Sequence, residues 1–548
     1  MTTVETSSGR VRGVDAGVHS FRGVPYAAPP VGPARFAPPR PHEPWPGVRD
    51  ATHPGPTAAQ PVLPVNVFGQ TIVPGDDVLH LDVHTLSVTG PLRPVVVWIH
   101  GGGMVVGGNA DVYGAGLARR GVVVVAINYR LGVDGFLVLD DAPSNRGVLD
   151  WVAALGWVRD NIARFGGDPA NVTVAGQSAG AAAAIILLTV PGAAGLFHRV
   201  FAMSGTPWNV VDLATARPHA ADLARRVGAE PSVAGIGAVE RDRLLAVQHE
   251  VAPVAGLDGF DEPLDLVRRL AGYELWLGPV VDGDVIPEHP LAAVARGVGD
   301  DVPVVTGSTG EEADALLSFI SAAVDPADAD AILADLGLAR AGVEAWRTEL
   351  ARRARRAGRP PPTPAAELGA AVTALSFRVP ALQLAEARAT GGPSSTFVYE
   401  VTWHADTPLG TVHGLDVPLV WDALGVDGAA ILLGDPPPLT LAGDMAGALV
   451  RFAADGDPGW PAYDPIDRRE LAFDVPSHAR HDPDPAARAL FGPLRAVPHA
   501  GSTPPAGRLN GPARPSLSRR RDRGGRGRHR SDRPPGRRGS SPRGRRSG

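Results

Sequence analysis

The sequence predicts an α/β protein built on a central, mostly parallel sheet with helices on both faces. From residue 94 onward, short and continuous apolar runs alternate with helical or long irregular segments. Continuous apolar runs are typical of strands buried on both faces, and their alternation with helices is typical of parallel sheets. The runs predicted as strands are 94–100, 122–129, 171–176, 199–205, 302–308 and 396–403.

The segments between these strands fit the same architecture. Residues 101–108, GGGMVVGG, are too rich in glycine for a regular element and are predicted as a loop. The segment 149–165, LDWVAALGWVRDNIARF, is predicted as a helix. Segments 210–275 and 315–385 are rich in alanine and arginine and lack strand-like runs, so we expect helical insertions that cap one end of the sheet. The first 70 residues hold only short apolar pieces among prolines and glycines.

Composition indicates one large globular domain and a different C-terminal tail. With 548 residues, 44% of them hydrophobic, the chain can bury a sizeable core, and we assign the domain to residues 1–498. The absence of cysteine excludes disulfides, thiolate metal ligands and a cysteine nucleophile. Residues 508–548 hold 15 arginines against two aspartates. The segment 499–548 is rich in Arg, Gly, Pro and Ser, and we expect it to be disordered.

The sequence gives no sign of export or of a membrane anchor. The N-terminal stretch MTTVETSSGRVRG has no basic segment followed by an apolar core. Proline and glycine interrupt the longest apolar runs too early for them to cross a bilayer. We therefore expect a cytoplasmic protein with no membrane partner.

One serine lies where a strand turns directly into a helix. The stretch NVTVAGQSAGAAAAIILL, 171–188, places Ser178 between Gly176 and Gly180 at that junction. This strand–turn–helix setting is the one that a nucleophile elbow requires. The glycines let the strand and helix backbones approach closely while the serine takes a strained conformation with its hydroxyl exposed. Ser178 is therefore a candidate nucleophile, and the alternative is an ordinary turn serine.

A serine nucleophile needs backbone donors for the oxyanion that forms during attack. Three glycines, Gly101, Gly102 and Gly103, come directly after the predicted strand 94–100 and can present N–H groups without side-chain obstruction. The residue after the nucleophile supplies a further N–H. The alternative is a flexible glycine loop.

The nucleophile also needs a general base and an acid that orients this base. In this architecture they follow in the order serine, acid, histidine. Glu311 and Glu312 follow the strand 302–308, and His413 follows the strand 396–403. These groups lie beyond the carboxyl ends of strands, where open α/β sheets place their sites. Order and placement leave open which of the two glutamates is the orienting acid. The chain has sixteen histidines, so other histidines remain alternatives for the general base.

Several longer stretches occur in order between residues 4 and 475. They include FRGVPYAAPPVGPARF (21–36), VVVWIHGGGMVVGG (95–108), VPVVTGSTGEEA (302–313) and GTVHGLDVPLVW (410–421). In these stretches the chain resembles the type-B carboxylesterases, the α/β-hydrolase family that includes bacterial p-nitrobenzyl esterases and the cholinesterases. The resemblance implies an α/β-hydrolase fold with helical cap insertions. It also implies hydrolysis of carboxylic esters through an acyl-enzyme.

The resemblance also implies a role for each site residue. Ser178 matches the family nucleophile, His413 the general base, and Glu312 rather than Glu311 the acid. Gln177 stands where Glu is commoner in the family. The positions that match the oxyanion donors are Gly102, Gly103 and Ala179.

The expected partner is a small-molecule ester, and no metal or organic cofactor is needed for this chemistry. Two other interpretations remain. One is a catalytically silent binding protein of the same fold. The other is binding of nucleic acid through the basic tail, whose charge would give a salt-dependent affinity. The tail is also consistent with out-of-frame translation of GC-rich DNA.

Overall fold

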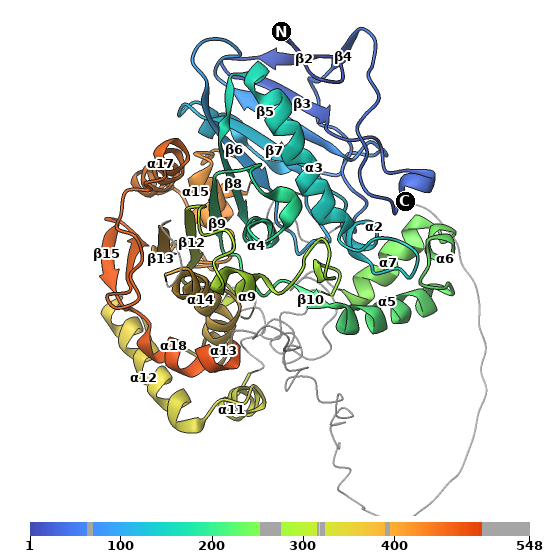
Figure 1. The fold of residues 1–548 in the computed structure, drawn as a ribbon. Coiled ribbons are helices and arrows are strands. Elements are labelled where there is room, and N and C mark those ends of the chain that lie inside the picture. The colour runs from blue at the N-terminus through green and yellow to red at the C-terminus, as the bar shows by residue number, and fades with distance from the viewer. Residues whose placement is uncertain are drawn as a thin grey trace, which may run out of the picture. The chain divides into compact units, whose positions relative to one another are not determined.

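A computed structural model describes residues 1–62, 70–252, 276–314, 317, 324–389, 395–426 and 428–495 (Figure 1). Its sheet has thirteen strands, and seven consecutive neighbours at its centre are parallel. The prediction of a mostly parallel central sheet flanked by helices is therefore confirmed. The predicted tail, 499–548, lies outside the described residues. In sheet order the parallel strands are β7 (Val123–Ile127), β6 (Arg93–Ile99), β8 (Gly167–Gln177), β9 (Arg199–Met203), β12 (Val304–Thr309), β13 (Thr396–Val401) and β14 (Arg469–Phe473).

Antiparallel strands extend the sheet at both edges, and the sequence did not reveal them. At the N-terminal edge, β2 alternates between exposed and buried residues, and β5 is buried throughout but alternates between polar and apolar side chains, so neither contains a continuous apolar run. None of these edge strands is among the runs predicted from the sequence. The added strands are β1 (Thr2–Glu5), β2 (Arg10–Asp15), β3 (His19–Pro25), β5 (His80–Thr85) and β15 (His478–His481), with β4 (Val48–Asp50) parallel to β2.

Helices cover both faces of the parallel strands. Along β6, Val95, Val97 and Ile99 belong to one buried cluster, and Val96 and Trp98 belong to another. Successive strand residues point to opposite faces, so this alternation shows that both faces are buried. The first cluster includes residues of α3 (Arg146–Asn161), α4 (Ala179–Leu187), α9 (Pro290–Ala295) and α14 (Val379–Arg388). The second includes residues of α1 (Gly114–Ala118), α15 (Asp416–Val420), α16 (Ala429–Leu433) and α17 (Leu439–Asp455).

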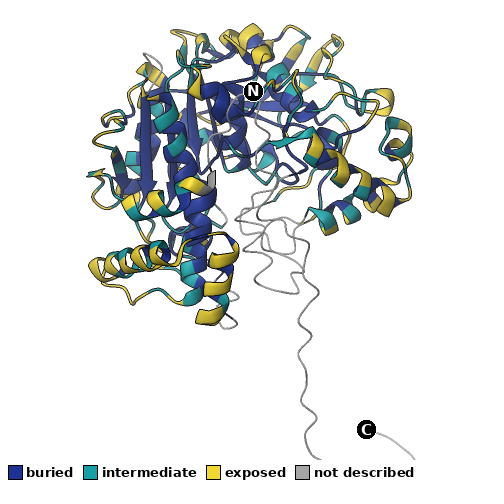
Figure 2. Ribbon diagram, turned by 60° about the horizontal axis from the view of Figure 1, so that its bottom comes forward, coloured by how far each residue is buried: buried dark blue, intermediate teal, exposed yellow. Residues whose placement is uncertain are grey.

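The described parts of the two predicted insertions are largely helical. They lie in two groups below the sheet in Figure 1 and carry much of the exposed surface in Figure 2. One detail differs from the prediction, since a two-residue strand, β10 (Val211–Asp212), pairs with β11 (Val280–Val281). The helices are α5 (Leu213–Val227), α6 (Val233–Gly237), α7 (Arg241–Val251), α11 (Pro326–Asp335), α12 (Arg340–Arg356) and α13 (Pro364–Thr373).

A π-helical turn, Ala374–Arg378, joins α13 to α14. Among the described residues, the continuous helix Pro364–Arg388 is long and apolar enough to cross a membrane by length and composition. In the fold, 89% of its most apolar window is buried against the rest of the protein. It is therefore a core helix, interrupted by one wide turn.

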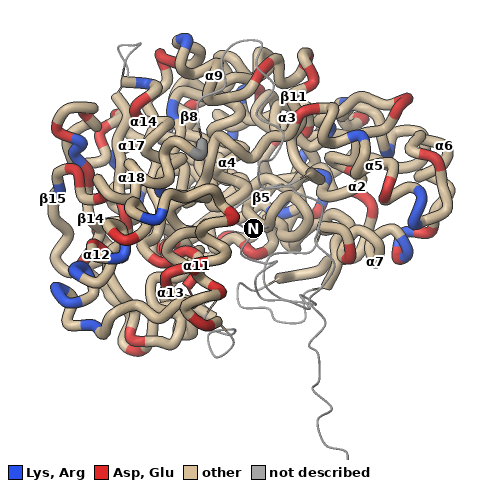
Figure 3. The backbone as a smooth tube through the Cα atoms, turned by 90° about the horizontal axis from the view of Figure 1, so that it is seen from below, with Lys and Arg blue, Asp and Glu red and all other residues tan. Residues whose placement is uncertain are grey.

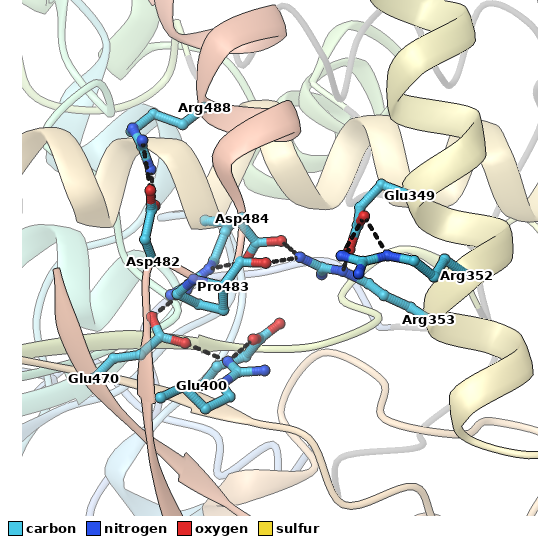
Figure 4. A network of polar contacts seen from close by, with 11 residues as sticks. Glu349, Arg352, Arg353, Glu400, Glu470, Asp482, Pro483, Asp484 and Arg488 are labelled. Carbon is cyan, nitrogen blue, oxygen red and sulfur yellow. Dashed lines mark hydrogen bonds and ion pairs between the residues drawn. The ribbon is translucent and has the colours of Figure 1, made fainter. Parts of the chain in front are cut away.

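A buried network of ion pairs fixes this π turn (Figure 4). Arg378 of the turn donates to Asp484, which precedes α18 (Pro485–Phe491), and to Glu470 on β14. Arg353 of α12 also donates to Asp484. Burial would raise the pKa of this aspartate, but the arginines hold it at about 2. Acidic and basic residues gather around α12, α18 and β14 in Figure 3. Removing one member would leave a buried charge uncompensated, so the network holds the turn in place.

Candidate active site

Ser178 lies at the sharp junction between β8 and α4, as predicted. Its backbone has φ 57° and ψ −125°, a left-handed conformation that is strained for a residue with a Cβ. The crossing of strand and helix leaves no room for side chains on either glycine. A Cβ on Gly180 would lie 1.9 Å from the carbonyl oxygen of Ile99, and one on Gly176 would lie 2.4 Å from the carbonyl carbon of Gly180. The two glycines are therefore required for the sharp turn in which the half-buried serine lies.

The glycine loop after β6 lies directly beside the serine. A Cβ placed on Gly101 would be 3.2 Å from the Cβ of Ser178. Gly102 has φ +107°, and a side chain there would meet the carbonyl oxygen of Val106 at 2.1 Å. Within the described chain, the N–H groups of Gly102 and Gly103 have no hydrogen-bond acceptor. They are therefore free to receive an acceptor from a bound molecule.

Ala179 is the first residue of α4. The first N–H groups of an α-helix have no partner within the helix, and the helix dipole makes this end favourable for negative charge. The three residues that match the oxyanion donors thus come from two elements that meet at Ser178.

Glu312 faces His413 across a short hydrogen bond. The distance from His413 Nδ1 to Glu312 Oε2 is 2.5 Å. The other carboxylate oxygen, Oε1, accepts from the hydroxyl of Ser204 at 2.6 Å and from the N–H of Thr309 at 2.7 Å. The glutamate is buried. A buried carboxylate with three donors is fixed in position and can orient the imidazole.

The electrostatics of this pair favour the protonated histidine. Burial by itself would lower the pKa of His413, but the charge and hydrogen bond of Glu312 outweigh it and raise the pKa above its ordinary value. Asp416, three residues later, is a buried acid with one carboxyl oxygen, Oδ1, that has no hydrogen-bond partner in the described structure. Burial, followed by repulsion from Glu312, raises the pKa of Asp416 to about 7. No feature of the sequence singled out this acid.

Glu311 points away from the imidazole and contacts the loop that carries it. Its Oε2 accepts from the backbone N–H of Thr411 at 3.1 Å and lies 3.3 Å from Nε2 of His404. Its Oε1 accepts from Arg359, which follows α12. The structure therefore brings Glu312 to His413 and leaves Glu311 to hold the backbone two residues before the histidine.

The second imidazole nitrogen has an unexpected partner. Nε2 of His413 lies 3.0 Å from the side-chain nitrogen of Gln177, the residue before the candidate nucleophile. The hydroxyl of Ser178 makes no hydrogen bond with any described residue. The ring of Phe377, from the π turn, packs against the imidazole with its centroid 5.0 Å away.

Sequence reasoning missed three side chains that contact or adjoin the predicted site residues, and the three differ in how strong a signal they carried. Ser204 falls within the predicted strand 199–205, where a hydroxyl at the carboxyl end of a central strand was a usable signal. Gln177 was noticed only as a departure from the family pattern. Phe377 carried no signal, because its contact depends on the π turn.

The walls of a substrate pocket are only partly described. Phe377, which lies in the predicted cap insertion 315–385, packs against the imidazole. Residues 253–275, 315–316 and 318–323 lie outside the described residues. Within the ranges that the structure describes, no group of three His, Asp or Glu side chains is arranged to hold a metal ion.

Comparisons of the sequence and of the structure with known proteins find the same kind of relative. A family model described as the carboxylesterase family matches residues 1–481. The para-nitrobenzyl esterase of Bacillus subtilis (strain 168) is 33% identical over 513 residues, which cover 90% of this chain and 99% of that protein. The phenmedipham hydrolase of Pseudarthrobacter oxydans is 38% identical over 339 residues, 60% of this chain and 64% of its own. The crystal structure of the Geobacillus stearothermophilus carboxylesterase EST55 at pH 6.2 superposes with a TM-score of 0.76 at 32% identity, covering 89% of this chain and 99% of that one.

Proposed function

The chain belongs to the carboxylesterase family and hydrolyses carboxylic esters, and we propose that it does so with Ser178 as nucleophile, His413 as general base and Glu312 as the acid that orients it. One observation carries this assignment. The 2.5 Å contact between His413 Nδ1 and Glu312 Oε2 occurs beside a serine that lies in a sharp, strained turn between two glycines. A nucleophile, a base and an orienting acid in one place are the groups that acyl transfer requires.

The proposed acylation step follows from these groups. His413 Nε2 takes the proton of the Ser178 hydroxyl as the serine oxygen attacks the ester carbonyl. Glu312 keeps the proton of the imidazole on Nδ1 and stabilises the imidazolium that forms. The imidazolium then protonates the leaving alcohol, and the acyl group remains on the serine.

Deacylation repeats the same proton transfers with water. His413 takes a proton from water, the hydroxide attacks the acyl-enzyme, and the acid leaves as the serine recovers its proton. In both steps the carbonyl oxygen becomes an anion. We assign its donors to the free N–H groups of Gly102 and Gly103 and to that of Ala179 at the start of α4. Loss of one such donor typically costs about 3–4 kcal/mol of transition-state stabilisation, so this loop contributes nearly as much as the triad.

We assign small, uncharged carboxylic esters as the substrates. The aromatic ring of Phe377 beside His413 offers an apolar wall for the acyl or alcohol group. The name of the Bacillus subtilis relative, a para-nitrobenzyl esterase, points to the same class. No metal or organic cofactor enters the proposed steps. The cytoplasmic location and the domain boundary near residue 498 stay predictions.

Pre-steady-state hydrolysis of p-nitrophenyl acetate and butyrate tests the assignment. Wild-type protein should release a burst of nitrophenolate equal to the enzyme concentration, and Ser178→Ala should release none. Equal turnover by both proteins would show that Ser178 is not the nucleophile. Fluorophosphonate labelling addresses the silent binding protein, because a chain without catalysis would not be labelled on Ser178. Binding of nucleic acid through the tail would be seen as salt-dependent affinity that is lost when residues 499–548 are removed.

A further inference from the structure

The side chain of Gln177 makes a hydrogen bond with Nε2 of His413, the atom that accepts the Ser178 proton in the proposed reaction. An amide nitrogen only donates hydrogen bonds, so in the 3.0 Å contact His413 Nε2 must be the acceptor. The opposite nitrogen, Nδ1, then carries the proton and donates to Glu312. The contact with Gln177 therefore requires the neutral imidazole in the tautomer that catalysis requires, and it opposes the rise in the pKa of His413 that Glu312 causes.

The rest of the amide lies against the glycine loop. A Cβ on Gly101 would be 3.2 Å from Gln177 Oε1 and 3.2 Å from the Cβ of Ser178. The glutamine is only 8% exposed. Its amide therefore spans the space between the glycine loop and the imidazole, beside a serine hydroxyl that has no hydrogen bond to the described residues.

One lone pair on Nε2 cannot serve two donors equally well. Either the Gln177 amide or the Ser178 hydroxyl can donate to it with good geometry. We propose that Gln177 is a positioning residue that holds His413 in a resting arrangement. When an ester binds, Nε2 of His413 exchanges the hydrogen bond from the Gln177 amide for one from the Ser178 hydroxyl. This inference rests on the proposed function, because it concerns the base of the same triad.

The pKa of His413 reports on the contact with Gln177, because, in the part of the chain that the structure describes, few other groups face the imidazole. On the Nδ1 side His413 faces the carboxylate of Glu312, and Asp416 with its partner Tyr399 lies behind that pair. The ring of Phe377 packs on its face. Among the described residues, Gln177 is the one polar side chain that contacts Nε2. A donor on that lone pair stabilises the neutral imidazole and not the imidazolium.

The decisive variant is Gln177→Met, which keeps the length of the side chain and removes the donor. Without the competing donor, acylation at alkaline pH, where His413 is neutral in both proteins, should become faster by about two- to tenfold, the range that corresponds to one net hydrogen bond. The neutral imidazole also loses its donor, so the pKa of His413 should rise by about half a pH unit to one pH unit. Gln177→Glu should raise this pKa further, because a carboxylate favours the imidazolium, and should therefore slow acylation near neutral pH.

The burst rate with p-nitrophenyl acetate, measured from acid to alkaline pH, reports both quantities. An independent readout is the strongly downfield proton of the short Nδ1–H···Oε2 hydrogen bond, whose NMR titration gives the pKa of His413 without substrate. The matched control is Gln248→Met. Gln248 is another buried glutamine, lies in the first insertion and accepts a hydrogen bond from the backbone N–H of Val133. Its burst rate and the titration of His413 should stay as in wild type.

The outcomes separate this inference from the proposed function. A faster burst and a higher pKa in Gln177→Met alone support the inference. A slower burst with an unchanged or lower pKa overturns it and leaves the triad intact. The double variant Gln177→Met with Ser178→Ala supplies the second check. A burst that persists in it refutes the assignment of Ser178, and the inference that rests on that assignment falls with it.

Discussion

Ser204 offers a sharp test of how Glu312 is held. Its hydroxyl donates to Glu312 Oε1 at 2.6 Å inside the protein, on the side of the carboxylate that faces away from His413. Ser204→Ala removes this one oxygen. The backbone of Ser204 has φ 53°, but serine and alanine both carry a Cβ, so the substitution leaves that strain unchanged. The variant therefore isolates a single charge-assisted hydrogen bond.

The size of the effect follows from the charge and burial of the acceptor. A hydrogen bond to a charged group contributes about 1.5–3 kcal/mol to stability, and the free energy of unfolding should fall by that amount. The N–H of Thr309 still donates to the same carboxylate, so the acid stays in place and kcat/KM should fall by only about tenfold. With less of its charge neutralised, Glu312 should raise the pKa of His413 further. Since the base must be neutral to act, the acid limb of the pH–rate profile should move to higher pH.

Urea unfolding and the pH dependence of kcat/KM with p-nitrophenyl acetate measure these changes. Ser308→Ala is the matched control, because Ser308 is equally buried and its hydroxyl has no hydrogen-bond partner in the described structure. The free energy of unfolding of the control should be within about 0.5 kcal/mol of that of the wild type. If Ser204→Ala behaves like this control in both stability and pH profile, then the Ser204 hydroxyl does not support the acid and the reasoning fails.

Three further predictions concern the elbow, the buried acid and the histidine loop. Gly180→Ala should lower the melting temperature and abolish activity, because its methyl group would lie 1.9 Å from a strand carbonyl oxygen. The control is Gly156→Ala in α3, where the methyl group meets open space. This variant should have an unchanged free energy of unfolding or be stabilised by up to about 1 kcal/mol. Asp416→Asn removes an acid that ionises near pH 7 and raises the pKa of His413, so its pH–rate profile should show an acid limb at lower pH than wild type. Arg359→Ala breaks the partly exposed ion pair with the acid that holds the histidine loop and should lower kcat/KM by about fivefold or less, with recovery in Arg359→Lys. An elbow variant as active as wild type, an unmoved acid limb or an unrestored lysine variant would contradict the respective argument.

Much of the fold could be predicted because its signals are local. Strands buried on both faces need continuous apolar runs, and 94–100, 122–129 and 396–403 contain such runs at the positions of β6, β7 and β13. The N-terminal strands escaped prediction because they contain no continuous apolar run: β2 has a solvent-facing side, and the fully buried β5 carries polar residues at alternate positions. Their residues alternate over only a few positions, and proline and glycine surround them.

The candidate nucleophile was also visible in sequence, since the elbow depends on residues within two positions of it. Gly176 and Gly180 are required because the strand and the helix cross there, and the crossing is fixed by the local chain path. Order along the chain then limited the acid to Glu311 or Glu312. Only the family resemblance favoured the second.

Tertiary structure decided what the sequence left open at the site. Glu311 and Glu312 are neighbours, yet one contacts the backbone of Thr411 and the other the imidazole of His413, because adjacent side chains project in different directions into surroundings built by segments about 100 residues away. The contact between Gln177 and His413 spans 236 residues. The sequence by itself therefore determined the parallel centre of the sheet and the elbow, where a few neighbouring residues set the backbone. Which groups share each proton at the site was decided by packing between distant segments, which no local pattern encodes.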